Sequence, residues 1–96
     1  MTQPSVRFET GEWEWVAERG SVGFVGQTDL GPVEFLITGE ALAELLNPDL
    51  AGIDGELAAE IFAEFEADIH GVARREFVSR LGGEPPILLT AADVAA

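Results

Sequence analysis

Apolar and polar residues alternate over three short stretches near the start of the chain, at residues 5–9, 21–27 and 33–37. A period of two sends successive side chains to opposite faces, which is typical of a half-buried strand. Thr10-Gly11 is expected to end the first strand, because glycine interrupts strand interiors. Residues 12–17 fit either a further strand or a single helical turn.

The second and third stretches are predicted to pair as a β-hairpin. Residues 28–31 between them are turn-forming types, and Pro32 suits the first position of the third strand. Gly23 and Gly26 lie inside the second strand, where glycine marks a bulge or a close backbone approach.

Two helices follow, and each begins at a residue suited to capping. Thr38 fits the N-cap of a short helix that runs to about Leu46, where Asn47-Pro48 ends it. Asp54 fits the N-cap of a long helix, in which Gly71 is the expected place for a kink and residues 82–86 supply the stop. The long helix carries apolar residues at the spacing of one helical face: Ala58, Ile61, Phe62, Phe65, Ile69, Val72, Ala73, Phe77 and Leu81.

The end of the chain adds one short strand, residues 87–89, and a terminal turn. Thr90 followed by Asp93 resembles a capping box in which aspartate replaces the usual glutamate or glutamine. The order of elements predicts an α+β fold: a mainly antiparallel sheet of three to four short strands packed against one short and one long helix. With 96 residues, 47% of them hydrophobic, the chain fits a single compact domain over residues 1–96.

Four carboxylates stand four residues apart on the predicted long helix: Glu56, Glu60, Glu64 and Asp68. Residues at this spacing lie on nearly the same helical face, so the sequence predicts one acidic stripe. Like charges four residues apart oppose helix formation by roughly 0.2–0.5 kcal/mol per pair. A chain with three such pairs in succession either tolerates that cost or uses the charge.

The charge balance of the whole chain is also strongly acidic. Eighteen acids stand against five bases, all arginine, which gives a net charge of −13. An acidic body repels nucleic acid and anionic membranes and attracts basic partners. It also keeps a bacterial-type protein soluble without any role in binding, so the composition by itself leaves both interpretations open.

Trp13 and Trp15 are the other candidates for contact with a partner. In an extended segment both side chains face the same side, where they can serve the core or an interface. On the interface interpretation, Glu12, Glu14 and Glu18 would rim the aromatic patch with acid.

Few residues suggest catalysis, a metal or a cofactor. The absence of cysteine excludes a disulfide frame, a thiolate nucleophile and a cysteine-ligated metal. His70, the one histidine, has Glu66 one turn before it, but two ligands fall short of a zinc site, and a solvent-exposed histidine paired with a carboxylate is expected instead. The glycine-rich residues 20–26 lack a P-loop lysine. We expect no enzyme, no metal and no cofactor; an enzyme would need two or more of Glu9, Glu34, His70 and Asp93 to converge in a cleft.

The sequence also carries expectations about location. The first fifteen residues are polar and acidic, unlike a signal peptide, and no apolar run approaches the roughly 18–20 residues of a membrane span. A cytoplasmic protein with no membrane partner is the prediction.

The order of core residues resembles that of a known family. The positions that carry the likeness are Phe8, the tryptophan pair, Phe24, residues 33–37, Glu40-Ala41-Leu42, Phe65, Asp68-Ile69 and residues 88–93. They resemble the small bacterial proteins of the domain of unknown function 1488 family, over almost the whole chain. Phe35 departs from that pattern, since those proteins often carry a cysteine in the second hairpin strand. The resemblance implies a compact α+β fold in a bacterial cytosol and supplies no catalytic or binding residues.

These observations predict a small non-enzymatic acidic protein whose helix face engages a basic protein surface. One form of this function is mimicry of nucleic acid, because carboxylates one turn apart are roughly 6 Å apart, close to the spacing of phosphates along a strand. Such a protein would inhibit or regulate a DNA-binding machine. The alternative is a structural or small-ligand-binding domain with a pocket between sheet and helix, lined by residues such as Phe24, Phe35 and Phe65.

Self-association is a further prediction. Arg74 and Arg75 follow the carboxylates on the predicted long helix, and Arg80 lies four residues after Glu76. The helix would then have an acidic first half and a mildly basic second half, which suits a homodimer with antiparallel or head-to-tail helices.

Overall fold

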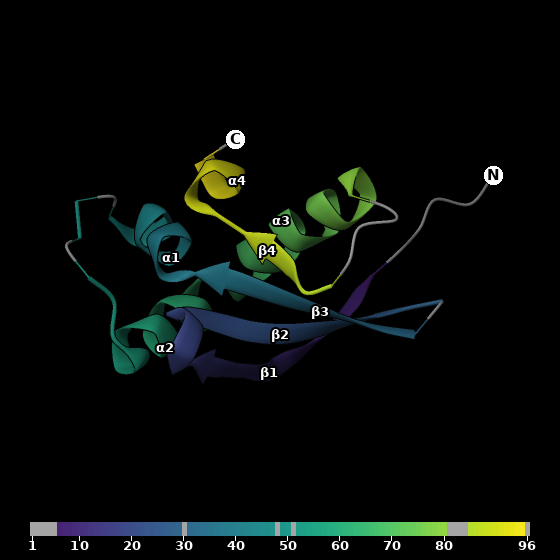
Figure 1. The fold of residues 1–96 in the computed structure, drawn as a ribbon, viewed down its shortest axis with the longest axis horizontal. Helices are drawn as coiled ribbons and strands as arrows, with labels where there is room; N and C mark the ends of the chain where they lie inside the picture. The colour runs from purple at the N-terminus through teal and green to yellow at the C-terminus, as the bar shows by residue number, and fades with distance from the viewer. Residues whose placement is uncertain (1–5, 30, 48, 51, 81–84, 96) are drawn as a thin grey trace.

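The computed structural model describes residues 6–29, 31–47, 49–50, 52–80 and 85–95. The elements in chain order are β1 (Arg7–Val16), the 3₁₀ turn η1 (Ala17–Arg19), β2 (Ser21–Thr28), β3 (Gly31–Thr38), α1 (Gly39–Leu46), α2 (Gly55–Glu64), α3 (Glu66–Ser79), β4 (Ile87–Leu89) and α4 (Ala91–Ala95) (Figure 1). The predicted α+β class is confirmed. Parts of the predicted strand and helix ends, at Ser5, Pro48 and residues 81–84, lie outside the described residues.

The four strands form one sheet in the order β1-β2-β3-β4. The first three pair antiparallel, and β4 pairs parallel with β3, so the sheet is mixed but mainly antiparallel. A parallel pair needs a crossover connection. Helices α1, α2 and α3 supply it between β3 and β4, and α4 follows beside α1 (Figure 1).

The β2–β3 hairpin agrees closely with the sequence. Its register is unbroken from Ser21 opposite Thr38 to Thr28 opposite Gly31. Gly31 has a φ of +111°, in the region that favours glycine, and the Thr28 hydroxyl donates to its carbonyl oxygen at 2.7 Å. The strand begins one residue before Pro32, at Gly31.

Strand β1 differs from the prediction because Thr10-Gly11 does not end it. The strand continues through Trp13 and Trp15 to Val16, and the helical-turn alternative for residues 12–17 is wrong for all but the last residue. Its register passes from Phe8 opposite Gly26 to Trp13 opposite Phe24, so five steps along β1 face two along β2. Gly11, with a φ of +84°, lies in this bulged segment.

The core lies between one face of the sheet and the helices. Phe24 and Phe35 stack with their ring centroids 5.3 Å apart, and Phe24 meets Phe62 of α2 edge-on at 5.3 Å. Gly26 leaves room for side chains and not for the close backbone approach that was predicted, because a Cβ there would collide with the side chains of Val6 and Phe8.

The helices begin where the sequence predicted. The Thr38 hydroxyl accepts from the amide of Ala41 at 3.1 Å, and the Asp54 carboxylate accepts from the amide of Leu57 at 2.8 Å. The predicted single long helix is wrong, however, because it breaks at Phe65 into α2 and α3.

At Phe65 the helical backbone dihedrals are interrupted, although hydrogen bonds continue on both sides. Phe65 has φ −105° and ψ 19°, outside the α-helical region, yet its amide bonds to Ile61 and its carbonyl accepts from Ile69, both at 2.9 Å. The apolar face is kept on both sides, with Ala58, Ile61 and Phe62 buried on α2 and Ile69 and Ala73 on α3. Gly71, the expected kink, lies inside regular α3.

Candidate interaction surface

The four predicted carboxylates, Glu56, Glu60, Glu64 and Asp68, are all solvent-exposed. We call them the carboxylate ladder. The break at Phe65 divides it, with three members on α2 and Asp68 on α3. The four carboxylates therefore lie on two helices and not on the single long helix that was predicted.

Helix ends explain two of these four positions without any partner. Glu56 lies in the first turn of α2 and Asp68 in the first turn of α3, where a negative charge interacts favourably with the helix dipole. Glu60 lies mid-helix, with Glu56 and Glu64 four residues away on either side. Since like charges at that spacing repel, Glu60 weakens α2 and has no capping role to offset the effect.

The ladder carboxylates take part in none of the ion pairs among the described residues. Within the described ranges, ion pairs join Glu66 to His70, Glu76 to Arg75 and Arg80, and Asp93 to Arg80, and none includes a ladder carboxylate. The arginines of α3, predicted to make the second half of the helix basic, are held by other groups. Arg74 donates to the carbonyl of Val6 at 3.1 Å and lies 5.3 Å from the centre of the Phe8 ring.

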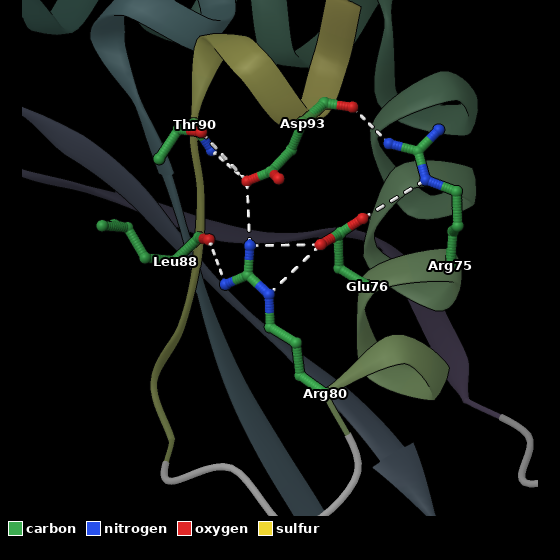
Figure 2. Close-up of polar contacts among 6 residues, drawn as sticks. All are labelled: Arg75, Glu76, Arg80, Leu88, Thr90 and Asp93. Carbon is green, nitrogen blue, oxygen red and sulfur yellow. Dashed lines mark hydrogen bonds and ion pairs between the residues drawn. The ribbon is translucent and has the colours of Figure 1, made fainter. Parts of the chain in front are cut away.

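Arg80 is the centre of a network that joins α3 to the end of the chain (Figure 2). Its guanidinium lies 3.1 Å from Glu76 and from Asp93, and it donates to the carbonyl of Leu88 at 2.8 Å. Arg75 adds contacts to Glu76 at 3.3 Å and to the carbonyl of Asp93. The predicted Glu76–Arg80 pair is confirmed, but no local pattern predicted that the same arginine also contacts β4 and α4.

One half of the predicted capping box at Thr90 and Asp93 is confirmed. The Asp93 carboxylate accepts from the Thr90 amide at 2.8 Å and from its hydroxyl at 3.0 Å. Burial raises the pKa of Asp93, but the hydrogen bonds from Thr90 and the charge of Arg80 together lower it by more. The pKa of Asp93 therefore lies below its usual value. These acids are therefore compensated inside the fold.

His70 is not the solvent-exposed residue that was expected. Its ring stacks on Phe8 at 4.4 Å with an interplanar angle of 11°, and its side chain is only 12% exposed. Glu66 lies 3.8 Å away and accepts from the amide of Gly11 in the β1 bulge at 2.9 Å. Burial lowers the pKa of His70, the Glu66 charge raises it, and the Arg74 charge lowers it, with a net shift downward. A signal for this burial existed, since Phe77 is seven residues further on and places His70 beside the apolar stripe.

The tryptophans pack against α2. The Trp13 ring lies 5.0 Å from the Phe62 ring, and a Cβ on Gly55 would come within 3.0–3.3 Å of the Trp15 indole. Both side chains are half-buried. Glu14 pairs with Gly23 in the adjacent row and points to the opposite face, so Glu14 does not rim the tryptophans as predicted.

Three of the four residues named for an enzyme lie apart in the structure. His70 packs on the helix side of the sheet, whereas Asp93 is held by Arg80 and Thr90 near the end of the chain. Glu34 lines a hollow on the other side of the sheet. Within the described ranges, no group of three or more histidine, aspartate or glutamate side chains is arranged to hold a metal ion. Nor does any described helix have the length and apolar character to cross a membrane.

The predicted internal pocket also takes a different form. Phe24 and Phe35 are buried and stacked on each other, and Phe65 lies half-buried at the helix break. These side chains help to fill the space between sheet and helices. The hollow of about 540 Å³ that Phe24 and Phe35 border lies on the outer face of the sheet.

The fold defines a small α+β protein with an acidic helix surface, and one solved structure shares this fold. It is a protein of unknown function from the DUF1488 family of Shewanella loihica PV-4, with a TM-score of 0.68 and 20% sequence identity over 94% of this chain and 93% of that one. The likeness predicted from the core residues is thereby confirmed at the level of the fold. No protein-family model matches the chain. No curated protein matches it either.

Proposed function

We propose that this protein is a non-enzymatic binding module whose carboxylate ladder engages a basic surface on a partner protein. The observation that carries the proposal is Glu60. It is exposed, repelled by Glu56 and Glu64, and has no cation beside it among the described residues. A position that weakens its own helix is explained if its charge acts outside the molecule.

The break at Phe65 limits how many phosphates a nucleic-acid mimic on this surface could match. Eight residues separate Glu56 from Glu64, so the straight row is roughly 12 Å long at 1.5 Å per residue. That length matches about three phosphates along one strand at the spacing given above. The fitting target is a compact cluster of lysines and arginines that contacts a few phosphates, as on an inhibited or regulated DNA-binding protein.

A paired charge-reversal experiment tests the proposal. Wild type and the Glu60→Arg, Glu64→Arg variant are immobilised and exposed to native extract at low and moderate salt. The matched control is Glu18→Arg, Asp49→Arg, which changes the net charge equally at exposed sites away from α2. We expect a basic protein that binds wild type and the control, is lost from the ladder variant, and dissociates as salt rises.

The result is then confirmed with purified partner and a DNA duplex. Wild type should displace the duplex, and the ladder variant should not. If the ladder variant and the control variant retained every protein equally, the ladder would be a solvated face. The alternative, a structural or small-ligand domain, would then be the better description.

A further inference from the structure

A second surface lies on the outer face of the sheet, away from the core. Its lining includes Val16, Gly23, Val25 and Leu36, together with the carboxylates of Glu12, Glu14 and Glu34. Glu14, Gly23 and Leu36 form one cross-strand row. The next row, Trp13, Phe24 and Phe35, contributes Phe24 and Phe35 to the core, so side-chain alternation directs the Glu14 row outward. We call this surface the sheet-face hollow.

The sheet-face hollow combines apolar and acidic groups. Val25 is 39% exposed, and Leu36 lies below it at 7%. Gly23 leaves space in the hollow because it has no side chain. A Cβ there would fit, since it would make only ordinary contacts, 3.4 Å from Val16 and 3.5 Å from Leu36. Glu12, Glu14 and Glu34 are all exposed, and among the described lining residues Arg19 is the single cation.

The backbone around the hollow decides which kind of element can cover it. Gly23 pairs with Glu14 on one side and with Leu36 on the other, so the strand edges here are already used. A strand laid on this face would find no backbone partners, and its own amide and carbonyl groups would be left without hydrogen bonds. A helix satisfies its backbone internally and contacts a sheet through side chains alone.

The charge decides the chemistry of that helix. Three carboxylates face one arginine, so a covering element must bring positive charge beside its apolar stripe. A second copy of this chain is a poor match, because it presents the same carboxylates and a net charge of −13. We propose that the sheet-face hollow binds an amphipathic helix of a partner protein, with apolar residues on Val25 and Leu36 and lysine or arginine beside Glu14 and Glu34.

This surface is independent of the proposed function, which rests on α2 on the other side of the sheet. The probe is a synthetic peptide of about 14 residues, roughly four helical turns, with leucine and lysine at helical spacing. Binding to ¹⁵N-labelled protein is followed by amide chemical shifts. We expect the largest shifts at Gly23, Val25 and Leu36. A peptide with glutamate in place of lysine should bind at least about tenfold more weakly.

Two variants separate shape from charge. Gly23→Leu fills the hollow and leaves the charge unchanged, and Glu14→Gln, Glu34→Gln removes two carboxylates and leaves the shape. Each should weaken binding of the leucine–lysine peptide about tenfold, and Val25→Ser serves as a second apolar variant if Gly23→Leu fails to fold. Glu60→Gln, Glu64→Gln should bind it within about twofold of wild type.

Three outcomes would overturn the proposal. Shifts centred on α2 would show that the peptide follows charge alone. Wild-type affinity in both Gly23→Leu and Val25→Ser would show that the hollow does not hold the apolar side chains. Shifts of Gly23 and Val25 that grow with protein concentration and no peptide would assign this face to a second copy of the chain.

Discussion

The carboxylate ladder and the Arg80 network are two acidic regions of one chain that differ in whether their carboxylates have a cationic partner. Around Arg80, both Glu76 and Asp93 lie 3.1 Å from a guanidinium nitrogen (Figure 2). On α2, Glu60 is flanked by two further glutamates and by no described cation. Acids near the end of the chain hold elements together, whereas the acids of α2 repel one another.

This difference shows why net charge alone says little about function. A carboxylate with a partner inside the fold stabilises it and offers little to another protein, because the partner already screens its field. An uncompensated carboxylate keeps its field and costs some stability. The surplus of acids over bases is therefore most informative where the structure leaves it unpaired.

Arg80→Met should give the largest effect, because it removes compensation where the fold relies on it. The methionine keeps the apolar stem but leaves Glu76 and Asp93 without their shared cation and removes the hydrogen bond from Arg80 to the Leu88 carbonyl. Arg80 is more than a third exposed, so water screens part of the loss. We expect the free energy of unfolding in urea to fall by about 1–2 kcal/mol.

The matched control for Arg80→Met is Arg19→Met, at an exposed arginine with no ion pair within the described ranges. It should change stability by less than about 0.5 kcal/mol. Similar losses in the two variants would mean that the network contributes nothing beyond removal of a positive charge from an acidic protein.

Glu66 is an intermediate case between these two regions, because the charge of its neighbour His70 depends on pH. His70 lies 3.8 Å from Glu66, but burial against Phe8 lowers the pKa of His70 below its usual value of 6.5. The folded state therefore resists protonation of His70 more than the unfolded chain does. As pH falls through 6.5 the unfolded state binds the proton first, so the contribution of His70 to stability is present at higher pH and declines on acidification.

The check is the unfolding free energy of wild type and of His70→Gln, measured from about pH 8 to about pH 5.5. Both proteins share every other titrating group, so the difference between them isolates the histidine. We expect wild type to lose stability relative to the variant on acidification. A relative gain on acidification would mean that the attraction to Glu66 outweighs burial and the charge of Arg74.

Sequence reasoning predicted most of the fold because local signals and packing agreed. The hairpin, both N-caps at Thr38 and Asp54, and the Thr90–Asp93 box were all set by nearby residues. The bulge in β1 and the helix break at Phe65 were not predicted, and the bulge depends on contacts across the core. The β1 register is explained by two contacts with the helices, of Phe8 with His70 and of Trp13 with Phe62.

The residues of the candidate surface were predictable from the sequence, but their surroundings in the fold were not. Spacing alone found Glu56, Glu60, Glu64 and Asp68, and all four are exposed. Spacing could not predict the helix break after Glu64 or the long-range contacts of the arginines. The i, i+4 pair of Glu76 and Arg80 was predicted from its spacing. The contacts of Arg74 with Val6 and Phe8, and of Arg80 with Asp93, join residues too far apart along the chain for a local pattern to report.

The smallest effect should come from neutralising single members of the carboxylate ladder, and its sign should depend on position. Glu60→Gln removes two repulsions at i±4 and no capping interaction, so we expect α2 to strengthen and the free energy of unfolding to rise by about 0.4–1 kcal/mol. Glu56→Gln, the control on the same helix, removes one repulsion and one favourable interaction with the α2 dipole, so it should be neutral or slightly destabilising. Both effects should shrink as salt is raised. If Glu60→Gln lowers stability, the mid-helix glutamate has a structural role after all, and the argument that its charge acts outside the molecule fails.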